Sequence, residues 1–291
     1  MTGLAILLVL LSAGAHASWN FLIKRSERPE VFTWWMAASA NAVVLPVVVF
    51  LYWRDPPGAA GWGFMVATWI LHLGYFVTLS RAYRDGDLSL VYPVARGAGL
   101  LLIPIGGVLV LSESVSPPAV AGAALILAGI FTLSWWGRFA SVIRAPLGTL
   151  RAPGMTYALL TGLLIAVYSV VDKRGVDHVA PFVYMFAVTS SATFGLLPII
   201  ARDHPRPAFA AEWRAHGVAI VAGGLLQYAA YGLVLSAMQL SPVSYIGPFR
   251  EVGLVFGVVL GAVVLKEPFG GGRTLGAILV TAGALVIALS P

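Results

Sequence analysis

Apolar runs of close to twenty residues, separated by short polar breaks, constrain this chain more than any other feature. A helix needs roughly 20 apolar residues to cross the hydrocarbon core of a bilayer. About ten such runs fill the chain of 291 residues, and only 10% of its residues are charged. Soluble domains carry about 25% charged residues. Most of the surface must therefore face lipid, and no segment remains for a soluble domain.

The runs predict an all-α integral membrane protein with ten transmembrane helices. The expected spans are 3–23, 31–53, 62–79, 88–111 and 119–136, then 155–171, 182–201, 218–240, 243–265 and 275–289. The connection 138–154 divides a first five-helix unit (1–137) from a second (155–291). The first run lacks a basic segment before it and a clean cleavage site after it, so we expect a retained span rather than a signal peptide. Seven tryptophans near span ends are expected in interfacial belts.

An internal repeat relates the two units. A glutamate and two glycines stand nine and seven residues apart near the end of each: Glu113, Gly122 and Gly129, then Glu267, Gly276 and Gly283. Earlier residues match in the same order: Pro46 with Pro198, Ser89 with Ser244, and Pro93 with Pro248. Because five spans are an odd number, the second copy inserts in the opposite orientation. Inverted repeats of this kind are typical of secondary transporters, whose substrate sites lie between the repeats.

The first helix carries a polar stripe. Ser12, His16, Asn20 and Lys24 follow at four-residue spacing and share one face, with Trp19 beside them. Polar side chains in lipid are unfavourable, so this face is expected to line a cavity. The alternative is hydrogen bonding between helices, and the Lys24 side chain can also reach the interface.

Three charges are predicted deep within spans: Arg96, Arg250 and Glu251. Arg96 and Glu251 hold equivalent positions, three residues after the matched prolines. We expect them to approach each other across a central cavity, which leaves Arg250 for an anionic group such as a substrate carboxylate. The alternative is a structural arrangement of Arg250 and Glu251 with backbone carbonyls.

Further polar and aromatic side chains within the expected spans are also candidates for lining the cavity. His72 and Gln227 are equivalent in the repeat, and tyrosines accompany them at positions 75, 168 and 231. Tyrosine rings with buried bodies suit an organic, partly apolar ligand. Pro93 and Pro248 each remove a backbone donor within a span, which predicts breaks near the site or gating bends.

The segments SWNFLIKR and GDLSLVYPVARG, with the repeated E-x8-G-x6-G pattern, resemble the drug/metabolite transporter superfamily. The closer likeness is to its ten-helix EamA-type members, which include a bacterial aromatic amino acid exporter. The resemblance implies a 5+5 bundle around a central cavity, with the fifth and tenth helices peripheral. It implies as lining residues His16, Trp19, Asn20, Tyr75, Arg96, Tyr168, Gln227, Tyr231, Arg250 and Glu251. The small four-helix members couple protons through a glutamate in helix 1, and this chain has no acid there.

The expected function is a secondary transporter of the cell inner membrane. It would export amino acids or related small metabolites, and drug-like compounds as a further option, as a monomer and without cofactor or metal. The alternative is an exchanger of sugar-phosphate or nucleotide-linked metabolites, for which few cations are present. An enzyme is disfavoured because no catalytic constellation occurs, and a channel because no filter pattern occurs. No basic cluster suits nucleic acid, and the chain has no cysteine.

Two arguments about sidedness disagree. The connections after the odd-numbered spans hold thirteen of the Lys and Arg residues (3 + 2 + 3 + 3 + 2), and the other connections hold three. The positive-inside rule would place the thirteen in the cytoplasm and both termini outside. The family resemblance implies cytoplasmic termini.

Overall fold

Apolar stretches long enough to cross a bilayer fold here into helices, because only a helix satisfies its own backbone groups in lipid. The computed structural model describes residues 1–24, 26–137, 139–144, 146–264 and 270–291. Within that part of the chain, ten helical segments are long and apolar enough to span a membrane. The predicted all-α membrane fold with ten spans is confirmed.

The first five spans are α1 (Gly3–Ile23), α2 (Pro29–Arg54), α3 (Ala59–Asp85), α4 (Leu88–Leu111) and α5 (Pro117–Trp135). Two short helices, α6 (Phe139–Arg144) and α7 (Pro146–Leu150), occupy the connection. The last five spans are α8 (Met155–Gly175), α9 with α10 (Pro181–Ser190, Leu197–Asp203), α11 (Arg206–Leu240), α12 with α13 (Val243–Phe249, Gly253–Val264) and α14 (Gly271–Leu289).

Local chemistry sets where several helices begin. The Thr2 hydroxyl accepts a hydrogen bond from the Ala5 amide at 3.2 Å and caps α1, and the Asp87 carboxylate accepts from the Ser89 amide at 2.9 Å and caps α4. Before α8, Gly154 has a φ of +78°, and a Cβ there would lie 2.7 Å from the carbonyl oxygen of Ala82. Only glycine suits both demands.

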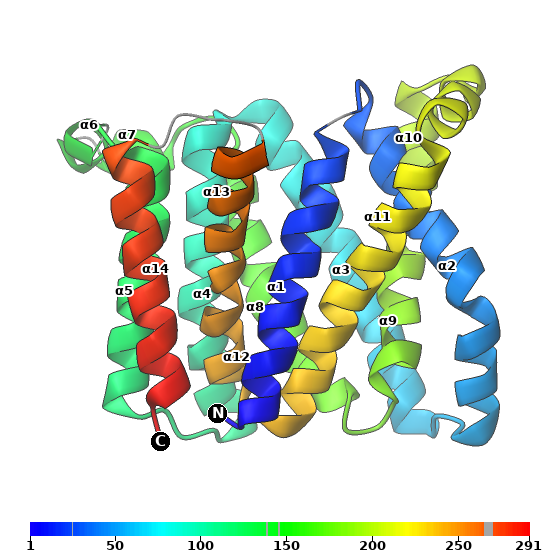
Figure 1. The fold of residues 1–291 in the computed structure, drawn as a ribbon, viewed down its shortest axis with the longest axis horizontal. Helices are drawn as coiled ribbons and strands as arrows, with labels where there is room; N and C mark the ends of the chain where they lie inside the picture. Colours follow the sequence, from blue (N-terminus) through cyan, green and yellow to red (C-terminus); the bar gives the residue numbers. More distant parts are fainter. Residues whose placement is uncertain (25, 138, 145, 265–269) are drawn as a thin grey trace.

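Both termini lie on one face of the bundle, at the bottom of Figure 1, which we call the terminal face. The opposite face carries the α1–α2, α3–α4 and α10–α11 connections together with α6 and α7 (Figure 1). We call it the basic face, because the described part of these connections holds arginines such as Arg28, Arg84 and Arg151.

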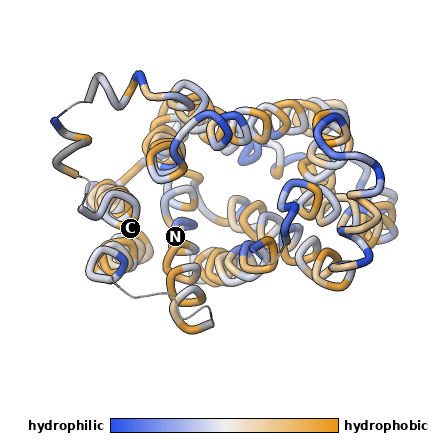
Figure 2. Tube along the Cα trace, turned by 90° about the horizontal axis from the view of Figure 1, so that it is seen from above, coloured by the Kyte–Doolittle hydropathy of each residue, from blue (hydrophilic) through white to orange (hydrophobic). Residues whose placement is uncertain are grey.

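Helices α5 and α14 pack against each other at one end of the molecule, beside the C-terminus (Figure 2). Two pairs of glycines let the backbones approach closely. A Cβ on Gly122 would lie 2.7 Å from the Gly283 carbonyl oxygen, and one on Gly129 would lie 2.9 Å from that of Gly276. Small residues at such crossings are typical of packed membrane helices. The glycines of the repeated pattern therefore hold the peripheral pair together; Glu267 lies outside the described residues.

Two spans of the second half are irregular. A π-helical turn, η1 (Ser191–Gly195), joins α9 to α10, and a 3₁₀ turn, η2 (Arg250–Val252), joins α12 to α13 directly after Pro248. Such turns often occur at functional sites. The matching Pro93 was also predicted to mark a break or a gating bend; α4 runs through Pro93 without a break, and a gating bend there stays a prediction.

Three tryptophan indoles donate hydrogen bonds to backbone carbonyls of neighbouring helices. Pro93 cannot donate to the Ser89 carbonyl, and the Trp135 indole donates to that oxygen at 3.1 Å instead. The Trp34 indole donates at 2.8 Å to the carbonyl of Thr193, inside the π-helical turn. The Trp35 indole donates at 3.0 Å to the Phe209 carbonyl. These three rings thus satisfy backbone groups between helices, beyond the belt role expected from the sequence.

Candidate functional site

A cavity of about 170 Å³ lies inside the bundle. Its walls come from α1, α2, α3, α4, α8, α9, α11 and the turn at η2. Its polar and aromatic lining consists of Ser12, His16, Trp19, His72, Tyr75, Phe76, Arg96, Tyr168, Thr189, Gln227, Tyr231 and Arg250. The lining residues that the resemblance implied come from six spans, and α2 and α9 are additions to that set.

The predicted ion pair across the cavity is present. Nη2 of Arg96 on α4 lies 3.0 Å from Oε2 of Glu251 in η2. The two side chains are 22% and 4% exposed, so both charges are largely withdrawn from solvent. The expectation that these repeat-equivalent residues approach each other is confirmed.

Arg250 lies beside this pair. Its Nε is 3.9 Å from Oε1 of Glu251, a longer contact than the one that Arg96 makes. The Arg250 side chain is 13% exposed and lines the cavity. Because one carboxylate faces two guanidinium groups, the cluster of Arg96, Arg250 and Glu251 carries one positive charge more than it neutralises. An anionic group in the cavity would balance it.

Three buried polar atoms around the cavity have no hydrogen-bond partner among the described residues: Trp19 Nε1, Arg96 Nε and Gln227 Oε1. Buried polar groups are normally hydrogen-bonded, and an unpaired one costs about 1–3 kcal/mol. The three include donors and an acceptor, so a polar molecule in the cavity could satisfy both kinds. Their grouping around one space is the arrangement of a binding site.

Aromatic rings form the apolar side of the cavity. The His72 ring lies 4.1 Å from that of Tyr168 and 5.6 Å from that of Tyr231, measured between centroids. Tyr75 packs edge-to-face on Tyr168 at 5.6 Å, and His16 packs edge-to-face on Trp19 at 4.8 Å. Such pairs hold the rings in fixed positions around an apolar ligand group.

A second cavity, of about 320 Å³, lies beside the first. The two share His16, Arg96 and Gly253 as lining residues. The second extends past Asn20 and Lys24 at the end of α1 and reaches Arg273 at the start of α14, in the direction of the basic face. We call it the vestibule.

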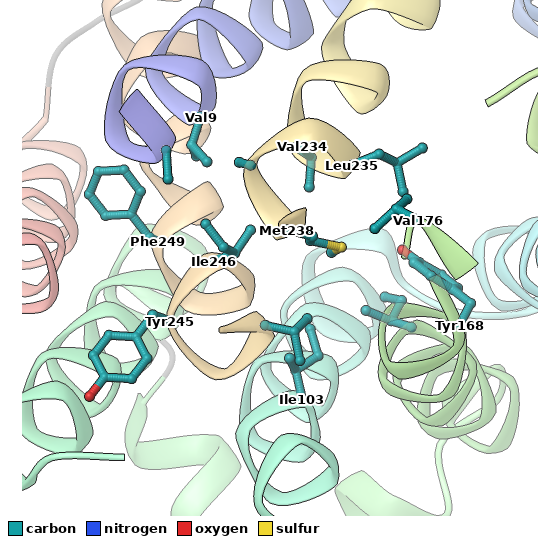
Figure 3. Close-up of a cluster of buried hydrophobic side chains, with 14 of the residues drawn as sticks. Val9, Ile103, Tyr168, Val176, Val234, Leu235, Met238, Tyr245, Ile246 and Phe249 are labelled. Carbon is teal, nitrogen blue, oxygen red and sulfur yellow. The ribbon is translucent and has the colours of Figure 1, made fainter. Parts of the chain in front are cut away.

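Packed apolar side chains close the opposite end (Figure 3). Val9 precedes His16 by two turns of α1, and Met238 follows Tyr231 by two turns of α11, both in the direction of the terminal face. Ile103 and Ile246, also in Figure 3, are 1% and 0% exposed. This cluster, which we call the terminal-side plug, separates the cavity from the terminal face.

The structure brings most of the predicted site residues together. Eight of the ten line the central cavity: His16, Trp19, Tyr75, Arg96, Tyr168, Gln227, Tyr231 and Arg250. Asn20 lines the vestibule instead, where its Nδ2 donates to the His16 carbonyl at 2.8 Å. Glu251 is 3% exposed and acts on the cavity through its ion pair.

Two buried carboxylates were missed, Asp172 on α8 and Glu212 on α11. Arg96, Arg250 and Glu251 were predicted to be the only charges deep within spans, and that prediction is wrong because Asp172 is 0% exposed. The predicted span ended at residue 171, whereas α8 continues to Gly175. Asp172 stands four residues after Tyr168, so the two share a helix face. That spacing was the available signal.

Comparison with known proteins supports a transporter domain. Residues 152–289 match the model of the EamA-like transporter family. The second half of the chain is thus similar to a domain of this transporter family. No curated protein sequence matches the chain. A solved structure titled only "Crystal structure of protein" is similar at 21% identity, with a TM-score of 0.77 over 99% of this chain and 98% of that one. This likeness concerns the fold.

Proposed function

We propose that this protein is a secondary transporter that exports zwitterionic amino acids, aromatic ones among them, or closely related small metabolites. The observation that carries the proposal is the central cavity, where unpartnered donors and an unpartnered acceptor surround a net positive cluster. The EamA-like match over residues 152–289 supports the transport role of the chain.

The cavity offers a complement for each part of an α-amino acid. Arg250 is the cation best placed for the carboxylate, because Arg96 already contacts Glu251 at 3.0 Å. Gln227 Oε1 lacks a hydrogen-bond partner among the described residues and can accept from the ammonium group. The rings of Tyr75 and Tyr168 would receive the side chain.

The size and charge of the cavity disfavour the alternative of phosphorylated sugars. Pockets for drug-sized ligands measure about 300–1,000 Å³, and the central cavity measures about 170 Å³. A diphosphate carries several negative charges, and one arginine not already paired at short distance would meet them. Small zwitterions fit better in both respects.

The mechanism we propose is alternating access between two inverted repeats, 1–137 and 155–291, in the cell inner membrane. The vestibule, whose lining includes Lys24 and Arg273 toward the basic face, and the packed terminal-side plug support a conformation that faces the basic side. We propose that the protein works as a monomer.

Counterflow in liposomes tests the proposal. Purified protein is reconstituted, loaded with one unlabelled compound at a time, and given the same compound in labelled form outside. We expect uptake of neutral amino acids with aromatic or branched side chains, and none of their carboxamides, of sugar phosphates or of cationic drugs. No uptake of any amino acid would contradict the proposal.

A matched pair of variants tests the role of Arg250. Arg250→Gln should reduce counterflow at low substrate concentration about tenfold or more, because hydrogen bonds to charged groups contribute about 1.5–3 kcal/mol. Arg54→Gln changes an exposed arginine at the end of α2 and should leave counterflow intact. Equal counterflow by the two variants would show that Arg250 does not bind the substrate.

A further inference from the structure

The buried pair of His72 on α3 and Asp172 on α8 is set apart from the Arg96–Glu251 cluster by its own hydrogen-bond network. We propose that His72 and Asp172 together hold one exchangeable proton, loaded from the central cavity, that couples transport to the proton gradient. This inference rests on the proposed transport function and identifies the proton as the ion that drives transport.

Three neutral hydroxyl groups surround the Asp172 carboxylate. Thr68 donates to Oδ1 at 2.6 Å, Tyr184 donates to Oδ1 at 3.0 Å, and Tyr231 donates to Oδ2 at 2.6 Å. No Lys or Arg of the described residues forms an ion pair with this carboxylate. Its negative charge therefore has no permanent counterion among the described residues. A buried carboxylate of this kind in a membrane protein is a candidate for carrying a proton.

The hydrogen-bond network fixes the tautomer of His72. The single proton of the Thr68 hydroxyl goes to Asp172, so Thr68 Oγ1 can only accept from His72 Nδ1, 3.0 Å away. The Thr68 carbonyl, 3.1 Å from the same Nδ1, can also only accept. Nδ1 therefore carries the hydrogen, and Nε2 of the neutral ring has a lone pair.

That lone pair faces the carboxylate. Nε2 of His72 lies 3.9 Å from Oδ2 of Asp172, with the two side chains 5% and 0% exposed. Without a hydrogen on either atom, Nε2 and Oδ2 are both acceptors, and no hydrogen bond forms between them. A proton placed on Nε2 turns the ring into an imidazolium that attracts Oδ2, so the pair has one vacant place for a proton. Nε2 takes this proton from water in the cavity and later gives it back to water, and no other covalent bond forms or breaks.

A proton fits this site better than a metal cation does. The hydroxyl hydrogens of Thr68, Tyr184 and Tyr231 point at the carboxylate, whereas a cation would need oxygen lone pairs turned toward it. Among the described residues, no group of three or more His, Asp or Glu side chains could hold a metal.

Every packed element contributes groups that act on the pair. From α3 and α8 these are Tyr75 and Tyr168, from α9 Tyr184, and from α11 Tyr231. Arg250 lines the same cavity as His72. A substrate carboxylate on Arg250 would reduce the positive charge of this cavity, so substrate and proton binding are linked. His72 and Tyr231 line the cavity, which gives the proton its route.

The first test measures proton binding without any substrate. Proton uptake by the detergent-solubilised protein is titrated with an indicator dye between about pH 8 and pH 5, the range in which histidine titrates. We expect Asp172→Asn and His72→Gln each to take up about one proton per molecule fewer than the unmodified chain. Uptake equal to that of the unmodified chain in both variants would overturn the proposal.

The second test separates coupling from transport. A one-unit pH gradient is imposed in each direction in turn on proteoliposomes, and accumulation of a labelled aromatic amino acid is measured. One proton per substrate supports about tenfold accumulation in one of the two directions. Asp172→Asn should keep counterflow at equal pH and lose accumulation. Accumulation by this variant equal to that of the unmodified chain would overturn the proposal.

The two tests also separate the two proposals. If the unmodified chain shows no counterflow of any compound, the transport proposal fails, and the titration still decides whether the site binds a proton. Size-exclusion chromatography checks the folding of each variant. If Asp172→Asn does not elute as a single species, the titration of His72→Gln decides, and unchanged uptake by that variant contradicts the proposal.

Discussion

At the scale of single residues, the buried charges of the cavity depend on one another. Arg96 and Glu251 meet at 3.0 Å with little exposure to water. Removing one partner leaves the other charge buried without compensation, which costs about 3–5 kcal/mol in known cases. Replacing both by apolar residues of similar size is far less damaging.

We therefore predict that Arg96→Met and Glu251→Met each lower the stability of the protein strongly, while the double variant recovers much of the loss. Denaturant unfolding in detergent micelles measures this, with the double-mutant cycle giving the coupling. Additive losses in the double variant would mean that the two residues do not interact.

Trp135 provides a second prediction at this scale. Its indole donates at 3.1 Å to the Ser89 carbonyl, which Pro93 leaves without its helical donor. Trp135→Phe removes that bond and should lower the free energy of unfolding by about 1 kcal/mol. The matched control, Trp53→Phe, changes a ring that is 82% exposed and should have little effect. Equal effects of the two substitutions would contradict this role.

The sequence predicts some of these contacts and not others. The repeat assigns Arg96 and Glu251 to equivalent positions in two helices, and each buried charge needs a polar partner. The contact between the two residues could therefore be predicted from the sequence. The Asp172 network joins α3, α8, α9 and α11. Its partners come from segments with no common spacing in the sequence, so only the fold reveals it.

At the scale of helices, close packing decides which substitutions the bundle tolerates. Gly129 on α5 faces the backbone of α14, where an added Cβ would lie 2.9 Å from a carbonyl oxygen. Backbone cannot move aside as a flexible side chain can. Overpacking of this kind typically costs about 1–3 kcal/mol.

We predict that Gly129→Val pushes α5 and α14 apart and lowers the melting temperature in detergent. Gly63→Val is the control, because nothing lies within 4 Å of a Cβ built on Gly63. Thermal unfolding monitored by circular dichroism compares the two variants. A melting temperature unchanged by Gly129→Val would show that this crossing is looser than described.

Helix ends divide into those that hydropathy predicts and those that it misses. The bounds of α1 and α4 agree with the expected spans 3–23 and 88–111, because polar or glycine residues follow the apolar run at once. The end of α3 extends beyond the apolar run into an arginine-bearing turn. In α11 a kink at His216, with φ −131° and ψ 15°, separates the apolar run from the arginine-bearing part before it. Hydropathy reports the part of a helix in lipid, and backbone hydrogen bonding continues past it.

At the scale of the whole molecule, helix contacts support the inverted repeat. In the repeat, α1 corresponds to α8 and α11 corresponds to α3. The contact between α1 and α11 therefore has its equivalent in the contact between α8 and α3, and both are present. The α5–α14 pair maps onto itself under the same exchange. The duplication itself stays a prediction, since these contacts agree with it without testing it.

Sidedness gives a prediction that suits a chain without cysteine. Glu27 and Asp55 are both exposed, the first on the basic face and the second on the terminal face. Glu27→Cys and Asp55→Cys should react with an impermeant thiol reagent from opposite sides of the membrane. If the positive-inside rule governs this chain, Glu27→Cys reacts from the cytoplasmic side. Reaction of both variants from the same side would contradict the ten-span topology.

The central claim is that the transport path runs through the cavity between the two halves. Ser12 lines that cavity and Ser169 does not, because the Ser169 hydroxyl donates to the Ile165 carbonyl within α8. Both serines are buried, at 6% and 0% exposure. Ser12→Cys and Ser169→Cys are thus a matched pair for thiol labelling.

Labelling of Ser12→Cys in membranes is the most direct measurement. We predict that an impermeant reagent reaches it from each side of the membrane in turn, that a transported amino acid slows the reaction, and that Ser169→Cys stays unlabelled. Ser12→Cys that reacts from one side only, at a rate that a transported amino acid does not change, would contradict the account.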